Sequence, residues 1–117
     1  MKVKEMIEEL KLELLTKDVS EDALYAEVED GYVSDLLSNA MGQGHDGMVW
    51  VTMQGHQNVA AVASLIGFAA VIVAGDAPVA QDTLHKANMN DVVIAATKAS
   101  AFEVVGKLYA LGVGKNN

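Results

Sequence analysis

The chain has 117 residues, a formal net charge of −8, and eight basic residues that are all lysine. Nucleic acids and anionic membranes are bound by clustered cations, so this charge balance argues against both as partners. The sequence contains no cysteine, which excludes disulfides, thiolate metal sites and a cysteine nucleophile. Hydrophobic residues make up 51% of the chain, enough for one core, and we expect a single domain over residues 1–117.

Nothing in the sequence predicts a membrane span or a secretion signal. The longest apolar run, residues 60–74, is shorter than the roughly 20 residues that a membrane-spanning helix needs. Residues 1–5 lack the apolar core of a signal peptide. We therefore expect a cytoplasmic protein.

The first part of the chain predicts one helix and two strands. Apolar residues recur at helical spacing from Val3 to Leu10, with charged residues between them. Residues 12–15 and 24–28 are strand candidates on either side of a polar loop over residues 16–22. That loop is too short for a helical crossover, so we expect these two strands to be antiparallel to each other.

The next segment predicts a turn, a helix and a loop. Asp30-Gly31 is a turn signal. Ser34 and Asp35 then offer N-caps for a helix that continues through Met41. Residues 42–47 are rich in glycine and predict a loop.

Residues 49–75 predict a βαβ unit. An apolar strand over 49–51 leads through a polar segment, 52–58, into a small-residue helix over 59–66 and a second apolar strand over 69–74. Buried parallel strands that flank a crossover helix have this pattern. Open sheets of this kind bind ligands beyond the carboxyl ends of their strands, so the polar segment predicts a site.

The C-terminal part predicts a helix, a strand and a second helix. Pro78 lies in the first turn of a helix that runs to about Asn88, and residues 92–96 form the last strand. Ser100 caps the final helix. The apolar residues on one side of that helix are Phe102, Val105, Leu108 and Tyr109. The resulting fold class is α/β, with a mixed, mostly parallel five-stranded sheet covered by helices.

Polar residues follow three of the predicted elements and define a candidate ligand site. If the strands before them run the same way, all three polar segments meet at one edge of the sheet. The residues that we expect to contact a small ligand there are Gly31, Tyr32, Ser34, Asp35, Thr52, Gln54, His56, Asn58, Thr97 and Ser100. The alternative is that the hydroxyls and Asp35 only cap helices, each cap contributing about 1 kcal/mol.

Some aromatic and imidazole side chains have more than one interpretation. His56, at a helix start, either exchanges a hydrogen bond with a ligand or bonds to the loop backbone. Tyr32 either stacks on a flat ligand, lies over the sheet edge, or contacts a second copy of the chain. Trp50 and Met53 are interpreted as core, or as cover beneath the site.

Motifs for catalysis and cofactor binding are missing from the sequence. Gly42–Gly47 matches G-x-G-x-x-G, but it follows a predicted helix and precedes a strand, the reverse of the dinucleotide fingerprint. There is no P-loop and no nucleophile elbow, and each histidine is alone on its element. Asp35 has no carboxylate partner in sequence for acid–base work. We therefore expect no catalytic residue, cofactor or metal, and no enzyme.

Several segments together resemble the DRTGG domain family. They are residues 31–38 with Met41, residues 49–59 and residues 100–103. The resemblance extends over nearly the whole chain, like a stand-alone version of the domain. It implies the fold of the N-terminal domains of HPr kinase/phosphorylase and MurF. It also implies a regulatory role, because such domains occur as regulatory modules attached to phosphotransacetylases and CBS-domain proteins.

The chain departs from this family at the residues that give the family its name. The positions of the Asp-Arg pair and the Thr-Gly-Gly run hold Tyr25, Ala26, Glu29, Asp30 and Gly31. Only the last glycine is kept, the arginine is lost, and two carboxylates replace neutral residues. This change makes the segment repulsive to a phosphate-bearing ligand.

Two non-catalytic functions fit these observations better than an enzymatic function does. The first is a non-catalytic regulatory module that senses a small ligand at the C-terminal edge of its sheet. The second is a homodimeric protein-interaction or assembly module without a small-molecule ligand. Its apolar face would come from the Met41 region and from the last helix, with Tyr109 and Leu111. A regulatory protein partner is compatible with either function.

Overall fold

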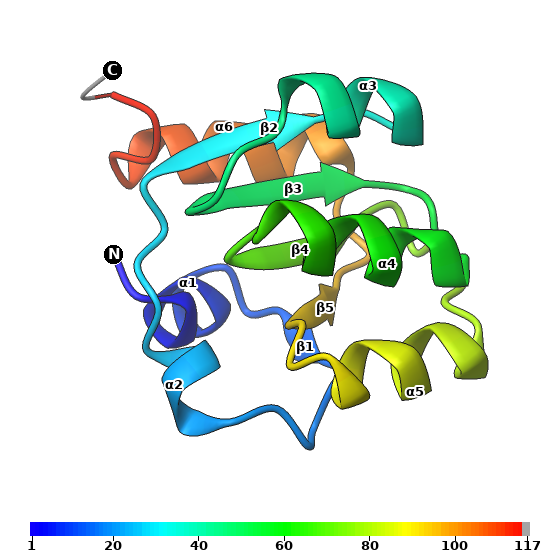
Figure 1. The fold of residues 1–117 in the computed structure, drawn as a ribbon. Coiled ribbons are helices and arrows are strands. Elements are labelled where there is room, and N and C mark those ends of the chain that lie inside the picture. The colour runs from blue at the N-terminus through cyan, green and yellow to red at the C-terminus, as the bar shows by residue number, and fades with distance from the viewer. Residues whose placement is uncertain (116–117) are drawn as a thin grey trace.

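The computed structural model describes residues 1–115 and has an α/β fold with one five-stranded sheet, ordered β1-β5-β4-β3-β2 (Figure 1). The strands are β1 (Glu13–Leu14), β2 (Asp30–Val33), β3 (Met48–Thr52), β4 (Ala70–Val73) and β5 (Ile94–Ala96). The helices are α1 (Val3–Glu9), α2 (Glu21–Leu24), α3 (Leu37–Gln43), α4 (Gln57–Ile66), α5 (Gln81–Met89) and α6 (Ala101–Ala110). Strands β2 to β5 are parallel and β1 is antiparallel to β5, which confirms the predicted fold class.

Helices cover both faces of the sheet. The three helices that each connect one parallel strand to the next, α3, α4 and α5, pack on one face (Figure 1). The parallel strands are added in chain order in one direction, so crossovers of one hand place these helices on the same side. After β5 the chain changes face, and α6 packs with α1 against the opposite side.

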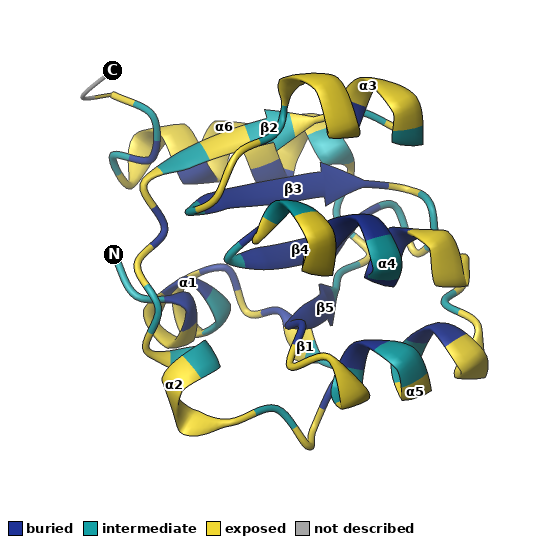
Figure 2. Ribbon diagram, viewed as in Figure 1, coloured by how far each residue is buried: buried dark blue, intermediate teal, exposed yellow. Residues whose placement is uncertain are grey.

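Side chains of the central strands alternate between the two faces. Val49 and Val51 of β3 face α1 and α6, whereas Trp50 between them faces α3 and α4. All of β3 and β4 is buried (Figure 2), which explains why both segments are continuous apolar runs in the sequence. Helix α4 packs closely on the sheet because its buried side includes Ala60 and Ala63.

The predicted strand over residues 24–28 is wrong. Residues Glu21–Leu24 form α2, and the hydroxyl of Ser20 accepts a hydrogen bond from the Ala23 N–H to cap it. A single bridge, between Lys2 and Glu27, is the only strand-like pairing of this segment among the described residues.

Packing against α1 explains why residues 24–28 resemble a strand. Leu24, Ala26 and Val28 pack into the core on the α1 side of the sheet. The backbone N–H groups of Val3 and Val28 donate to the carbonyls of Ala26 and Met1, at 3.0 and 2.8 Å. The alternation of apolar residues therefore comes from contact with α1, and the segment is not part of the sheet.

The second strand in the chain is β2, which occupies the predicted turn at Asp30-Gly31. β2 pairs with β3 alone and forms one edge of the sheet, and β1 forms the other edge. The first two strands in the chain, β1 and β2, run in opposite directions as expected, but they lie at opposite edges of the sheet, and the second of them is not the predicted strand over residues 24–28. A short edge strand that begins with Asp-Gly is hard to distinguish from a turn by sequence.

Two predicted helix starts are displaced. The N-cap of α3 is Leu36, without a side-chain bond, so Ser34 and Asp35 do not cap this helix. Pro78 lies in the loop before α5, which begins only at Gln81.

Helix α6 begins as predicted but turns a different side to the sheet. The Ser100 hydroxyl accepts a hydrogen bond from the first turn of the helix, at 3.2 Å. Val104 and Leu108 are buried, whereas Phe102 and Tyr109 are 89% and 59% exposed. Residues 101–115 include no further strand, and no helix of residues 1–115 is long and apolar enough to span a membrane.

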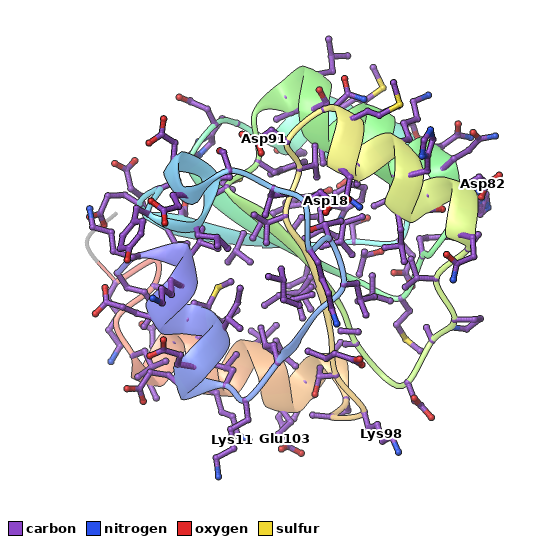
Figure 3. All side chains as sticks on the ribbon, turned by 90° about the horizontal axis from the view of Figure 1, so that it is seen from below. Lys11, Asp18, Asp82, Asp91, Lys98 and Glu103 are labelled. Atoms are coloured by element: carbon purple, nitrogen blue, oxygen red, sulfur yellow. The ribbon has the colours of Figure 1, made fainter. Side chains whose placement is uncertain are left out.

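The loop before α2 is tied to the turn before β5, where Figure 3 labels Asp18 and Asp91. The Asp91 carboxylate accepts hydrogen bonds from the N–H and the hydroxyl of Ser20, at 2.7 and 2.6 Å. These bonds, the hydroxyl first, hold the pKa of Asp91 below its usual value. Asp91 has a φ of 58°, a left-handed conformation that asparagine also tolerates.

We expect Asp91→Asn to destabilise the protein at neutral pH and to have a smaller effect in acid. The pKa of Asp91 is lowered in the folded state, so its stabilisation is fully present above the unfolded-state pKa, near 3.8. It is lost as the pH falls through the lower folded-state value. Urea unfolding at pH 7 and at about pH 3 measures both differences. A destabilisation that is equal at the two pH values would contradict this expectation, and Asp18→Asn is the control.

Candidate functional site

The carboxyl ends of β2, β3, β4 and β5 lie along one edge of the sheet, because these strands are parallel. The loops that leave this edge comprise residues 34–36, 53–56, 74–80 and 97–100. Eight of the ten residues that the sequence predicts for the site lie in these loops, at a strand end or in the first turn of α4. The exceptions are Gly31 and Tyr32, which lie within β2.

Asp35 joins the ends of β2 and β3. Its carboxylate accepts hydrogen bonds from the Thr52 hydroxyl at 2.8 Å and from the Met53 N–H at 2.7 Å. The Thr52 oxygen is buried and also accepts a bond from the Gln54 N–H at 3.1 Å. The hydroxyl thus donates one hydrogen bond and accepts one, and the arrangement fixes the loop after β3.

Ser34 and Trp50 extend this group. The Ser34 hydroxyl accepts from the Leu36 N–H at 3.0 Å, and the Ser34 carbonyl accepts from the indole N–H of Trp50 at 2.9 Å. Trp50 is fully buried and belongs to the core, whereas Met53 is about half exposed at the edge. Of the two interpretations of Trp50, core or cover beneath the site, the structure supports core.

Thr97 and Ser100 form a second, separate group beyond β5. Strand β4 lies between this group and the one around Asp35. The Thr97 hydroxyl accepts from the Ala99 N–H at 3.2 Å, and Ser100 caps α6. The strand ends share an edge as predicted, but their polar residues gather in two places.

His56 and Asn58 lie at the start of α4 and are exposed. His56 is the N-cap residue, but its side chain makes no capping hydrogen bond. With Gln54 it borders a depression of about 420 Å³ between the loop after β3 and residues 78–80. These side chains are accessible to a ligand, and the enclosing wall is mostly backbone and apolar side chains.

Tyr32 lies over the sheet face, away from the C-terminal edge. Its ring stacks on Phe68, with centroids 6.4 Å apart and an angle of 14° between the planes, and its hydroxyl donates to Asn39. Of the three interpretations offered by the sequence, the structure favours packing over the sheet. Gly31 lines an apolar hollow of about 210 Å³ between β2 and α6, on the opposite face.

A crevice opens at the carboxyl end of β5, between the chain that enters β1 and the loops that follow β4 and β5. Those two loops are joined where they leave the sheet, because the N–H groups of Gly75 and Asp76 donate to the carbonyls of Ala99 and Thr97, at 2.8 and 3.0 Å. The residues that line this β4–β5 crevice are Lys11, Glu13, Asp76, Ala77, Ala96, Thr97 and Lys98, and its volume is about 380 Å³. The loop after β4 leads to α5 on one face, and the loop after β5 leads to α6 on the other. The two loops separate only beyond their hydrogen bonds, and the crevice lies on the β1 side of them, at the sheet edge where open α/β sheets bind ligands.

The β4–β5 crevice carries four charged side chains that are not among the ligand contacts predicted from the sequence. Lys11 and Glu13 enter it because β1 is antiparallel to β5, which places Glu13 beside Ala96. Asp76 and Lys98 come from the loops after β4 and β5. Figure 3 shows Lys11 and Lys98 on the same side of the molecule, with Glu103 labelled between them in this view. Lys98 was adjacent in sequence to the predicted Thr97, but nothing local in the sequence brings Lys11 to this edge.

Metal and dinucleotide binding gain no support from the geometry. Among residues 1–115, no group of three or more histidine or acidic side chains is arranged to hold a metal ion. The glycine segment 42–47 connects the end of α3 to β3, as predicted. It therefore presents no helix N-terminus to a pyrophosphate.

No protein-family model and no curated protein matches this sequence. A solved structure matches 92% of the chain with a TM-score of 0.73 and 12% sequence identity. It contains the CBS and DRTGG domains of the regulatory region of Clostridium perfringens pyrophosphatase, complexed with the activator diadenosine tetraphosphate. The present chain spans 45% of that chain. This likeness shows that the fold is DRTGG-like.

We expect Asp35→Ala to destabilise the protein by about 1–2 kcal/mol, because it leaves the buried Thr52 hydroxyl without its acceptor. Urea unfolding measures the change in the free energy of unfolding. Ser38→Ala, an exposed substitution in the neighbouring helix α3, is the matched control and should change the free energy by less than about 0.5 kcal/mol. Equal effects of the two substitutions would show that Asp35 does not hold the loop after β3.

Proposed function

We propose that this chain is a non-catalytic, cytoplasmic regulatory module that senses a small ligand at the C-terminal edge of its sheet. The observation that carries this proposal is the β4–β5 crevice, which forms where the chain changes from one face of the sheet to the other. It contains Thr97 from the predicted site, and Ser100 lies just beyond it. The hydrogen bonds of Asp35 stabilise the neighbouring part of the same edge.

The comparison with a known regulatory region supports sensing over catalysis. The matched structure is that of CBS and DRTGG domains in the regulatory region of an enzyme, and it was determined with an activator bound. We extend to this chain the regulatory role that the description of that structure gives, with a small ligand as the signal.

The side chains at the edge also favour a role without catalysis. The one hydroxyl–carboxylate contact at the edge, Thr52 with Asp35, is buried and its hydrogen bonds are satisfied. His56 is not within hydrogen-bond distance of a described nucleophile. General acid–base chemistry needs such contacts, so the exposed polar groups at this edge are suited to binding.

A thermal-unfolding screen tests the sensing role. The panel contains nucleotides, including ATP and diadenosine tetraphosphate, together with organic acids, sugars and amino acids. A ligand present at 100 times its Kd stabilises the folded state by about 2.7 kcal/mol, which raises the Tm by roughly 11 °C in a chain of this size. We expect at least one compound to give a saturable rise.

The Lys98→Ala variant tests whether the compound that raises the Tm binds in the crevice. Lys17→Ala is the matched control outside the crevice. We expect Lys98→Ala to reduce the rise in Tm and Lys17→Ala to leave it unchanged. A panel in which no compound raises the Tm of the wild-type protein would contradict the proposal.

A homodimeric assembly module is the second candidate, and the exposed edge of β2 favours it. The N–H and C=O groups of alternate residues in an edge strand point away from the sheet and can pair with another strand. Val33 of this strand is 51% exposed, and Val105 and Tyr109 of α6 are exposed beside the same hollow. A second copy that pairs along β2 would cover these apolar side chains.

The mass of the protein in solution tests this second candidate. Multi-angle light scattering should give a dimer for the wild-type protein and a monomer for Val33→Lys, because the lysine charge would be desolvated in the contact. Leu65→Lys, an equally polar change at an exposed position of α4, should leave the dimer intact. A monomeric wild-type protein at working concentration would contradict the dimer.

A further inference from the structure

The charges of the β4–β5 crevice come in opposite pairs. Lys11 and Glu13 belong to the wall formed by the chain that enters β1, and Asp76 and Lys98 belong to the loops after β4 and β5. Each wall therefore contributes one ammonium and one carboxylate. None of the four forms an ion pair with another described residue, so all four are available to a ligand.

This arrangement disfavours ligands of a single charge sign. A phosphate or polyphosphate would face two carboxylates in a chain with a net charge of −8, without an arginine to bind it in bidentate fashion. A simple cation would face two ammonium groups. A small molecule with one positive and one negative group finds an opposite charge for each.

Thr97 adds a neutral donor to the crevice. Its oxygen already accepts from the Ala99 N–H, so the hydroxyl hydrogen remains to donate to a ligand carboxylate. The volume of about 380 Å³ suits a compact metabolite.

The end of α1 positions one of the charged residues at the crevice. Lys11 follows the C-cap residue of this helix and has a φ of 54°. The N–H groups of Lys11 and Leu12 donate to the carbonyls of Glu8 and Ile7, so the left-handed conformation of Lys11 terminates the helix. The helix end therefore brings Lys11 to the crevice.

We infer that the β4–β5 crevice binds a small zwitterion of the α-amino-acid class. The ligand carboxylate contacts Lys98 and the Thr97 hydroxyl, and the ligand ammonium contacts Glu13 and Asp76. This assignment rests on the proposed sensing function and specifies the ligand class of the same edge.

NMR titration of the ¹⁵N-labelled full chain tests the ligand class. The probes are the twenty protein amino acids, added singly, and for each one that binds, its analogue without the amino group and its analogue without the carboxylate. We expect at least one amino acid to shift the amide signals of residues 76–77 and 96–98 in a saturable way. Both analogues should bind about tenfold more weakly, because each loses a charge-assisted contact.

Variants that each remove one charge test which side chains contact the bound amino acid. Glu13→Gln and Lys98→Gln should each weaken the binding of the amino acid by about fivefold to tenfold, and Lys17→Gln should leave it unchanged. The replaced side chains are exposed, and the dispersion of the amide spectrum reports whether each variant is folded.

Three results would overturn the inference. They are no saturable shift with any of the twenty amino acids, equal binding of an analogue that lacks one charge, and shifts that lie outside the crevice. If a compound of another class raises the Tm and shifts the crevice amides, the ligand class is wrong and the sensing function stands. If no compound of either experiment binds, both proposals fail.

Discussion

The addition of four parallel strands in chain order, from β2 to β5, is the constraint on which the rest of this structure depends. It places α3, α4 and α5 on one face, so α1 and α6 must cover the other. It also brings the loops that follow these four strands to the same edge. The chain returns to the face covered by α1 only after β5, and the crevice lies at the end of that strand, beside the chain that enters β1.

The same constraint separates the polar groups that the edge presents. The bonds of Asp35 to Thr52 and Met53 stabilise the region between β2 and β3, and they leave few free hydrogen-bonding groups. The charged groups between β1, β4 and β5 have no partners of their own in the described chain. The end of the edge near β2 and β3 is thus held by internal hydrogen bonds, and we assign ligand binding to the end near β1 and β5.

Sequence patterns predicted the parts of the fold that are determined by local interactions. The unit from β3 to β4 follows from two apolar runs and a small-residue helix, and the start of α6 follows from the Ser100 cap. Residues 24–28 were misassigned because packing on α1 produces the same alternation as a strand. Lys11 and Glu13 could not be placed at the edge, because the antiparallel position of β1 beside β5 joins residues more than 80 positions apart.

The location of ligand binding is the central claim, and amide chemical-shift mapping with a deproteinised metabolite extract tests it most directly. The extract is titrated into the ¹⁵N-labelled protein, so the result does not depend on the choice of compound. We expect saturable shifts concentrated at residues 76–77 and 96–98. Shifts concentrated at residues 53–58 or along β2 and α6, or no saturable shifts at all, would contradict it.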